Sequence, residues 1–168
     1  MNQLSRLDIL KGALLLEYRG KALYESAVKT TEIPEVKALF SMLVNEEKKH
    51  IEVLRKHISQ VNNQSIPADT SELEHLSPEK TDPVLSKDIV KNVHGAGYEA
   101  AVISAALDFE KNAVKYYSDQ ASQTEDQGET TLFKWLKNWE VGHMQMLADL
   151  DRELKEKIWN DNQFWPLD

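Results

Sequence analysis

Apolar residues recur at spacings of three and four along most of the chain, a pattern typical of helices that bury one face. Four long helices are therefore predicted, over about residues 5–29, 34–61, 98–122 and 129–159. Ser5 and Asp8 have the form of a capping box at the first start, and Pro34 suits the first turn of the second helix. Gly128 is expected to mark the turn between the last two helices. The pattern predicts an all-α four-helix bundle.

The segment between the second and third helices, about residues 62–97, has a different composition. It is rich in Ser, Thr and Asp and contains several helix breakers: Pro67, Pro78, Pro83, Gly95 and Gly97. One short helix is expected near residues 86–92. A connection this long suits a crossover that travels the length of the bundle, so that the third helix starts at the opposite end.

Composition and charge exclude several function classes. A chain of 168 residues fits one domain, taken as 1–168, and its formal charge of −8 disfavours binding to nucleic acid. The absence of Cys excludes disulfides, iron–sulfur clusters and thiol catalysis. No apolar run reaches the roughly 20 residues of a membrane span, and the N-terminus lacks the features of a signal peptide. A cytoplasmic location without membrane association is expected.

The chain contains an internal repeat at an offset of 93 residues. Between positions 13 and 54, thirteen of forty-two residues are identical to those 93 positions later. Most of the identities fall at core-type positions, as expected for a duplicated helix pair. The polar exceptions carry the chemistry: Glu17 with Glu110, Tyr24 with Tyr117, Glu47 with Glu140, and His50 with His143.

The repeated Glu and His residues are expected to meet at one level of the bundle. In each half, Glu and His three residues apart lie on one helix face, as for Glu47 and His50. Glu32 lies midway between Glu17 and Glu47, within the predicted turn, and Glu125 occupies the equivalent place in the second half. Residues equally distant from the turn of an antiparallel hairpin lie at equal height. Four carboxylates and two imidazoles should therefore converge.

Such a cluster predicts a two-metal site. Four carboxylates in a low-dielectric core would repel one another strongly or stay partly protonated unless cations balance them. Hard carboxylate oxygens with one imidazole for each ion suit Fe or Mn, and Zn is an alternative. The expected cofactor is a pair of Fe ions. The expected metal ligands are Glu17, Glu47, His50, Glu110, Glu140 and His143.

These residues resemble those of the ferritin-like superfamily, and specifically its rubrerythrin-like branch. The resemblance rests on both Glu-x-x-His pairs and on the repeated Glu-x6-Tyr, which together cover all four helices. It implies that Glu47 and Glu140 bridge two metals and that Glu17 and Glu110 are terminal ligands. It also implies that Tyr24 and Tyr117 hydrogen-bond to ligand carboxylates, an arrangement that the residues alone do not distinguish from ordinary core tyrosines.

The sequence differs from peroxide-reducing rubrerythrins at two points. Those proteins carry another carboxylate one turn after the Glu of the third helix, where this chain has Ala113. They also carry a Cys-rich rubredoxin domain, and this chain has no Cys. The six expected ligands look closer to a ferritin or bacterioferritin ferroxidase centre.

Other polar residues are interpreted as surface groups. Glu72 and His75 form a third Glu-x-x-His without a repeat partner, and His57 and His94 lack convergent carboxylates, which leaves a surface or supporting role. Glu46 is assigned with its neighbouring lysines to the solvated face. The aromatic residues of the tail, 160–168, are expected to pack on the bundle or on a partner subunit.

The leading functional hypothesis is a di-iron oxidoreductase that reacts with oxygen or peroxide or oxidises ferrous iron, in the manner of a peroxidase or ferroxidase. Its electron donor would be external, and homodimerisation is expected from the resemblance. The alternative is a structural or partner-binding helical bundle in which a non-redox metal contributes only stability. These two readings differ in whether ligand substitutions change a catalytic rate or only the melting temperature.

Overall fold

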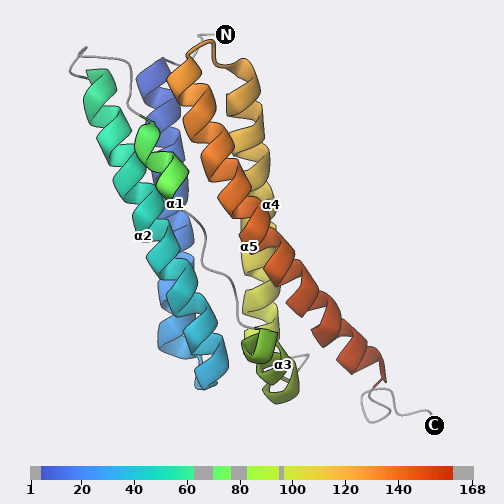
Figure 1. Cartoon of the computed structure of the whole chain (residues 1–168). Helices are drawn as coiled ribbons and strands as arrows, with labels where there is room; N and C mark the ends of the chain where they lie inside the picture. The colour runs from blue at the N-terminus through green and yellow to red at the C-terminus, as the bar shows by residue number, and fades with distance from the viewer. Residues whose placement is uncertain (1–4, 63–69, 77–82, 95–96, 161–168) are drawn as a thin grey trace.

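The computed structural model describes residues 5–62, 70–76, 83–94 and 97–160 (Figure 1). All regular structure within these ranges is helical. No helix among them combines the length and the apolarity that a membrane span requires. In chain order the elements are α1 (Arg6–Thr30), α2 (Pro34–Asn62), the short 3-10 helix η1 (Ser71–His75), α3 (Pro83–Asn92), α4 (Tyr98–Gln123) and α5 (Gln127–Asn160).

Two helical hairpins form the bundle. α1 packs along α2, α4 packs along α5, and α1 contacts α4 between the hairpins. α2 ends at the opposite end of the bundle from the start of α4, and the described parts of the connection, η1 and α3, lie beside α2 and at the lower end of the bundle (Figure 1). α3 closes the lower end of that view, where it contacts α2 and α5. This arrangement confirms the predicted all-α bundle with a long crossover, the ferritin-like architecture.

The helix ends follow the local sequence signals with one exception. Ser5 and Asp8 form the predicted capping box at the start of α1. Gly128 does not mark the turn before α5 but lies in its first turn, because Asp126 caps the helix by accepting a hydrogen bond of 2.9 Å from the backbone N–H of Glu129.

The crossover contains more structure than the sequence predicted. α3 begins at Pro83, earlier than expected, and η1 was not expected at all. η1 packs on α2: Leu73 is buried, and Lys56 forms an ion pair of 2.5 Å with Glu72. Phe164 and Trp165 of the tail lie outside the described residues, so their packing remains a prediction.

The apolar core is divided into two parts. The lower cluster, near α3 in Figure 1, includes Tyr24, Phe40, Ile89, Ile103 and Leu147, all fully buried. The upper cluster comprises Leu10, Ala13, Leu54, Leu73, Ala113, Tyr117, Leu132, Phe133 and Leu136. The repeated tyrosines belong to different clusters and reach the same polar region. The level between the clusters is where the repeated acidic residues lie.

Candidate metal centre

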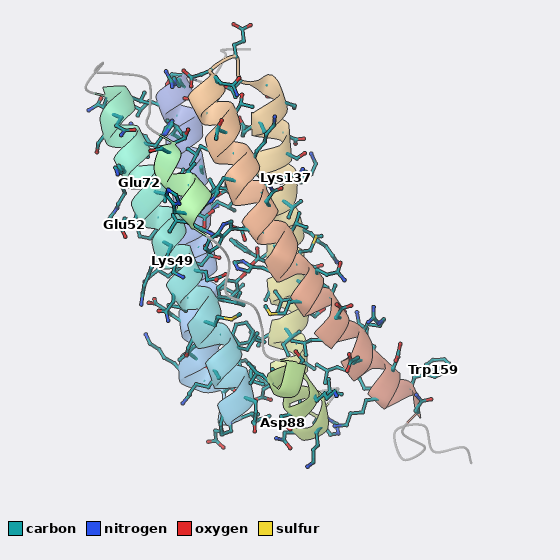
Figure 2. The ribbon with its side chains drawn as sticks, in the orientation of Figure 1. Lys49, Glu52, Glu72, Asp88, Lys137 and Trp159 are labelled. Atoms are coloured by element: carbon teal, nitrogen blue, oxygen red, sulfur yellow. The ribbon has the colours of Figure 1, made fainter. Side chains whose placement is uncertain are left out.

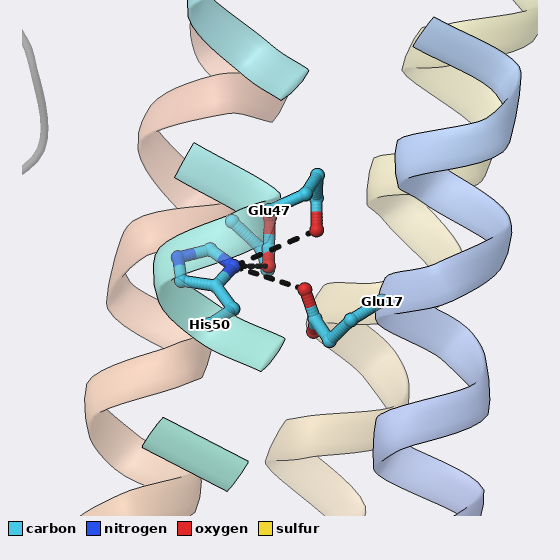
Figure 3. Close-up of side chains that lie close together, drawn as sticks. Glu17, Glu47 and His50 are labelled. Atoms are coloured by element: carbon cyan, nitrogen blue, oxygen red, sulfur yellow. Dashed lines mark hydrogen bonds and ion pairs between the residues drawn. The ribbon is translucent and has the colours of Figure 1, made fainter. Parts of the chain in front are cut away.

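The six residues predicted as ligands meet inside the bundle. Glu17 comes from α1, Glu110 from α4, and each Glu-x-x-His pair comes from α2 or α5. The turns of the two hairpins contain Glu32 and Glu125, and the ligand atoms that flank each turn come together, as equal height requires. All six side chains are buried, with exposures of 3% or less. Figure 3 shows Glu17, Glu47 and His50 converging on one point.

Around His50, the Nδ1 atom faces carboxylates from three helices. It lies 3.0 Å from Glu17 Oε2, 3.1 Å from Glu140 Oε1 and 3.7 Å from Glu47 Oε2. On the other side, His143 Nδ1 lies 3.0 Å from Glu140 Oε2 and 3.5 Å from Glu110 Oε1. Both imidazoles therefore present the same ring nitrogen to the acidic cluster, as expected for two related ligand positions.

The ligand atoms fall into two overlapping groups that could each hold a metal ion. In each group one ligand atom per residue lies within 4.8 Å of all the others. Glu47 and Glu140 belong to both groups, while each remaining Glu and His belongs to one. The groups are Glu17, Glu47, His50 and Glu140, and Glu47, Glu110, Glu140 and His143. This sharing is the geometry of a two-metal site with bridging carboxylates.

The repeated tyrosines connect the two halves. Tyr24 Oη donates to Glu110 Oε1, and Tyr117 Oη donates to Glu17 Oε1, so each half's tyrosine holds the other half's glutamate. Burial, followed by repulsion from the nearby carboxylates, raises the pKa of both tyrosines well above its ordinary value. Both hydroxyls therefore stay protonated and remain donors.

The cluster cannot carry four ionised carboxylates without cations. Burial and then repulsion from neighbouring carboxylates raise the pKa of Glu47, and they raise the pKa of Glu110 to about 8. Burial alone would also raise the pKa of Glu140, but His50 and His143 lower it. Burial alone would lower the pKa of His50 and His143. The surrounding carboxylates outweigh burial, so the pKa of both histidines is raised.

Unpartnered oxygens show that the residues fit metal ions. Glu47 Oε2 and Glu110 Oε2 are buried and have no hydrogen-bond partner among the described residues. A buried carboxylate oxygen without a partner is costly, whereas a cation between these residues would satisfy it. Two divalent ions would also balance the charge of four carboxylates. The donor set, hard oxygens with one imidazole for each ion, suits Fe or Mn.

Glu46 corrects the sequence interpretation. It was assigned to the solvated face, but its side chain is fully buried and its Oε2 contacts His143 Nε2. A signal was present in the sequence, because Glu46 shares the 3–4 spacing of the buried stripe Leu39, Leu43, His50 and Leu54. Lys48 and Lys49 had instead suggested that this part of the helix faces solvent. Glu46 therefore supports the site from behind one of its histidines.

Two tryptophans that the sequence analysis did not single out adjoin the other histidine. Trp135 and Trp139 of α5 meet the His50 ring edge-on, with ring centroids 5.5 and 5.0 Å from it. Trp139 is buried. His50 Nε2 is buried and has no hydrogen-bond partner among the described residues.

The other histidines behave differently from one another. Glu72, His75 and His94 are exposed, as expected. His57 is only 4% exposed, so a surface position is wrong for it. Burial lowers the pKa of His57. The charged groups near it include Glu129 and Arg6, which form an ion pair with each other and are not part of the acidic cluster.

Comparison with known proteins identifies the family. A model of the family described as Rubrerythrin matches residues 8–151, which contain all six clustered residues and both tyrosines. Neither the curated proteins nor the solved structures that were searched gave a match. Because the family model covers most of the chain and agrees with the helical bundle and its buried Glu/His cluster, the chain belongs to the rubrerythrin family.

Proposed function

We propose that the protein is a di-iron oxidoreductase whose metal pair reacts with oxygen or peroxide, or oxidises ferrous iron. The observation that carries the proposal is the pair of buried ligand groups that share Glu47 and Glu140. In the proposed site these two residues would hold both ions, because each belongs to both ligand groups. The terminal ligands are Glu17 with His50 for one ion, and Glu110 with His143 for the other.

An iron pair held here would supply one-electron steps on each ion, two electrons in all, for the reduction of oxygen or peroxide. The chain itself provides the setting. The upper and lower clusters keep water away from the acidic level, and Tyr24 and Tyr117 orient the terminal carboxylates. Glu47 and Glu110 hold protons more tightly than free glutamates do, so metal binding is expected to release protons.

Within this proposal we favour oxidation of ferrous iron over peroxide reduction. The residue one turn after Glu110 is Ala113, which packs in the upper cluster, and its repeat equivalent after Glu17 is Gly20. Neither position offers the additional carboxylate of peroxide-reducing rubrerythrins. These 168 residues also contain no Cys, so none of them could form a thiolate iron site that delivers electrons to the metals.

The test is rapid mixing after anaerobic loading with ferrous iron. Oxygen and hydrogen peroxide are mixed separately with the loaded protein, and near-ultraviolet absorbance follows formation of ferric iron. Ferrous oxidation with oxygen at two irons for each chain, lost when Glu47 and Glu140 are replaced by Ala, supports the proposal. Tight binding of Zn²⁺ without any turnover of loaded iron supports a structural bundle with a non-redox metal.

A further inference from the structure

The residues that lie behind the two histidines differ between the two halves of the internal repeat. The offset of 93 residues relates Glu46 of α2 to Trp139 of α5. Glu46 contacts His143, and Trp139 contacts His50, so these residues occupy equivalent places in the two halves. One histidine is therefore backed by a carboxylate and the other by an indole ring.

The carboxylate of Glu46 restricts the orientation of the His143 ring in the site. Glu46 Oε2 is in hydrogen-bond contact with Nε2 of the His143 ring, while Nδ1 of the same ring faces Glu110 and Glu140. Both partners of the contact are buried, with exposures of 0% and 3%. A carboxylate behind a ligating imidazole fixes its tautomer, restricts its rotation and increases its basicity. Glu46 also adds negative charge beside that position.

His50 lacks this support. Its Nε2 atom is buried without a hydrogen-bond acceptor in the described part of the chain, and Trp135 and Trp139 pack against the ring in T-shaped contacts. Packing limits the motion of the imidazole, but no acceptor behind it selects the tautomer that leaves Nδ1 free. The His50 position also lacks a charge equivalent to that of Glu46.

We infer that the two metal positions are inequivalent: the Glu110 and His143 position binds a divalent ion first and more tightly, and Glu46 is the positioning residue responsible. The inference rests on the proposed two-metal site and goes beyond it by assigning an order of loading. Removal of a carboxylate that supports a ligating histidine typically weakens metal binding 10- to 100-fold. The difference between the two positions is expected to be of that size.

The order of loading is tested by titrating the metal-free protein with Co²⁺ or Mn²⁺ under anaerobic conditions, with calorimetry and, for Co²⁺, visible absorption. The wild type is expected to bind two ions in two resolved steps. His143→Ala should remove the tighter step, and His50→Ala the weaker one. These two variants leave Glu46 intact, so they test the order without relying on folding of a Glu46 variant.

The role of Glu46 is tested in the same titration. Glu46→Leu, which removes both the charge and the acceptor, should weaken the tighter step about 10- to 100-fold and leave the weaker step unchanged. Glu46→Gln keeps an acceptor oxygen and should have a smaller effect. The control is Glu52→Gln, a substitution on the exposed face of α2 (Figure 2). Neither binding step should change in this variant.

Equal affinities in the wild type, or equal weakening of both steps by Glu46→Leu, would overturn the inference while leaving the two-metal site intact. Loss of the weaker step in His143→Ala would likewise reverse the assigned order. Absence of any stoichiometric binding to the wild type has a different meaning, because it would refute the proposed function itself.

Discussion

Replacement of Glu110 by Gln is expected to stabilise the metal-free protein at neutral pH. Burial and repulsion from Glu140 raise the pKa of Glu110 from 4.5 to about 8, so the folded protein keeps a proton at pH 7 that the unfolded chain loses. Retaining that proton costs about 3 kcal/mol, at about 1.4 kcal/mol per pH unit. Gln has the same shape without this cost, and its carbonyl can still accept the hydrogen bond from Tyr24.

The sign of the effect sets its pH dependence. Because the pKa of Glu110 is raised on folding, its contribution to stability is fully present below pH 4.5 and is lost as the pH rises to about 8. The advantage of Glu110→Gln should therefore be small at pH 5 and large at pH 7.5. With relaxation of the neighbouring groups we expect about 1–3 kcal/mol, a rise of several degrees in Tm for a chain of this size.

The assay is thermal unfolding followed by circular dichroism after treatment with a chelator, at pH 5 and pH 7.5. Glu52→Gln on the exposed face of α2 is the control and should stay within about 0.5 kcal/mol of the wild type. Addition of Mn²⁺ should reverse the ranking, since Glu110→Gln lacks one proposed ligand. A metal-free Glu110→Gln variant less stable than the wild type at pH 7.5 would refute the electrostatic reasoning.

Three further substitutions probe the surroundings of the site by thermal unfolding. Tyr117→Phe removes the donor to Glu17 and should cost about 1.5–3 kcal/mol, and an unchanged Tm would contradict the hydrogen bond. Gly20→Ala should cost about 1–2 kcal/mol because its Cβ would lie 2.8 Å from Phe109 Cε1; a more stable variant would show that the ring moves freely. Gly142→Ala meets nothing within 4 Å and should gain about 0.5–1 kcal/mol through helix propensity, so destabilisation there would argue against an open helix surface.

The sequence predicted the helices and the acidic cluster because both leave periodic signals. Apolar spacing marked the four long helices, and the repeat identified polar residues that lie in otherwise apolar stripes. Equal distances of Glu17 and Glu47 from the first turn then predicted their equal height. Equal height requires only an antiparallel hairpin, which the short connection between α1 and α2 enforces.

The residues that the sequence analysis misplaced lie where the repeat is broken or where neighbours conceal the pattern. Glu46 has Trp139 as its repeat equivalent, so no identity drew attention to it, and Lys48 and Lys49 suggested solvent. His57 continues the same buried stripe but has no carboxylate near it in sequence. η1 was missed because a five-residue 3-10 helix is too short for a periodic signal.

The most direct test of the central claim is the metal content of protein purified without added metal, measured by mass spectrometry beside a variant in which Glu47 and Glu140 are both Ala. The two ligand groups that share these residues predict about two ions for each chain in the wild type and none held in the variant. Absence of stoichiometric metal in the wild type, even after anaerobic loading with ferrous iron, would contradict the account.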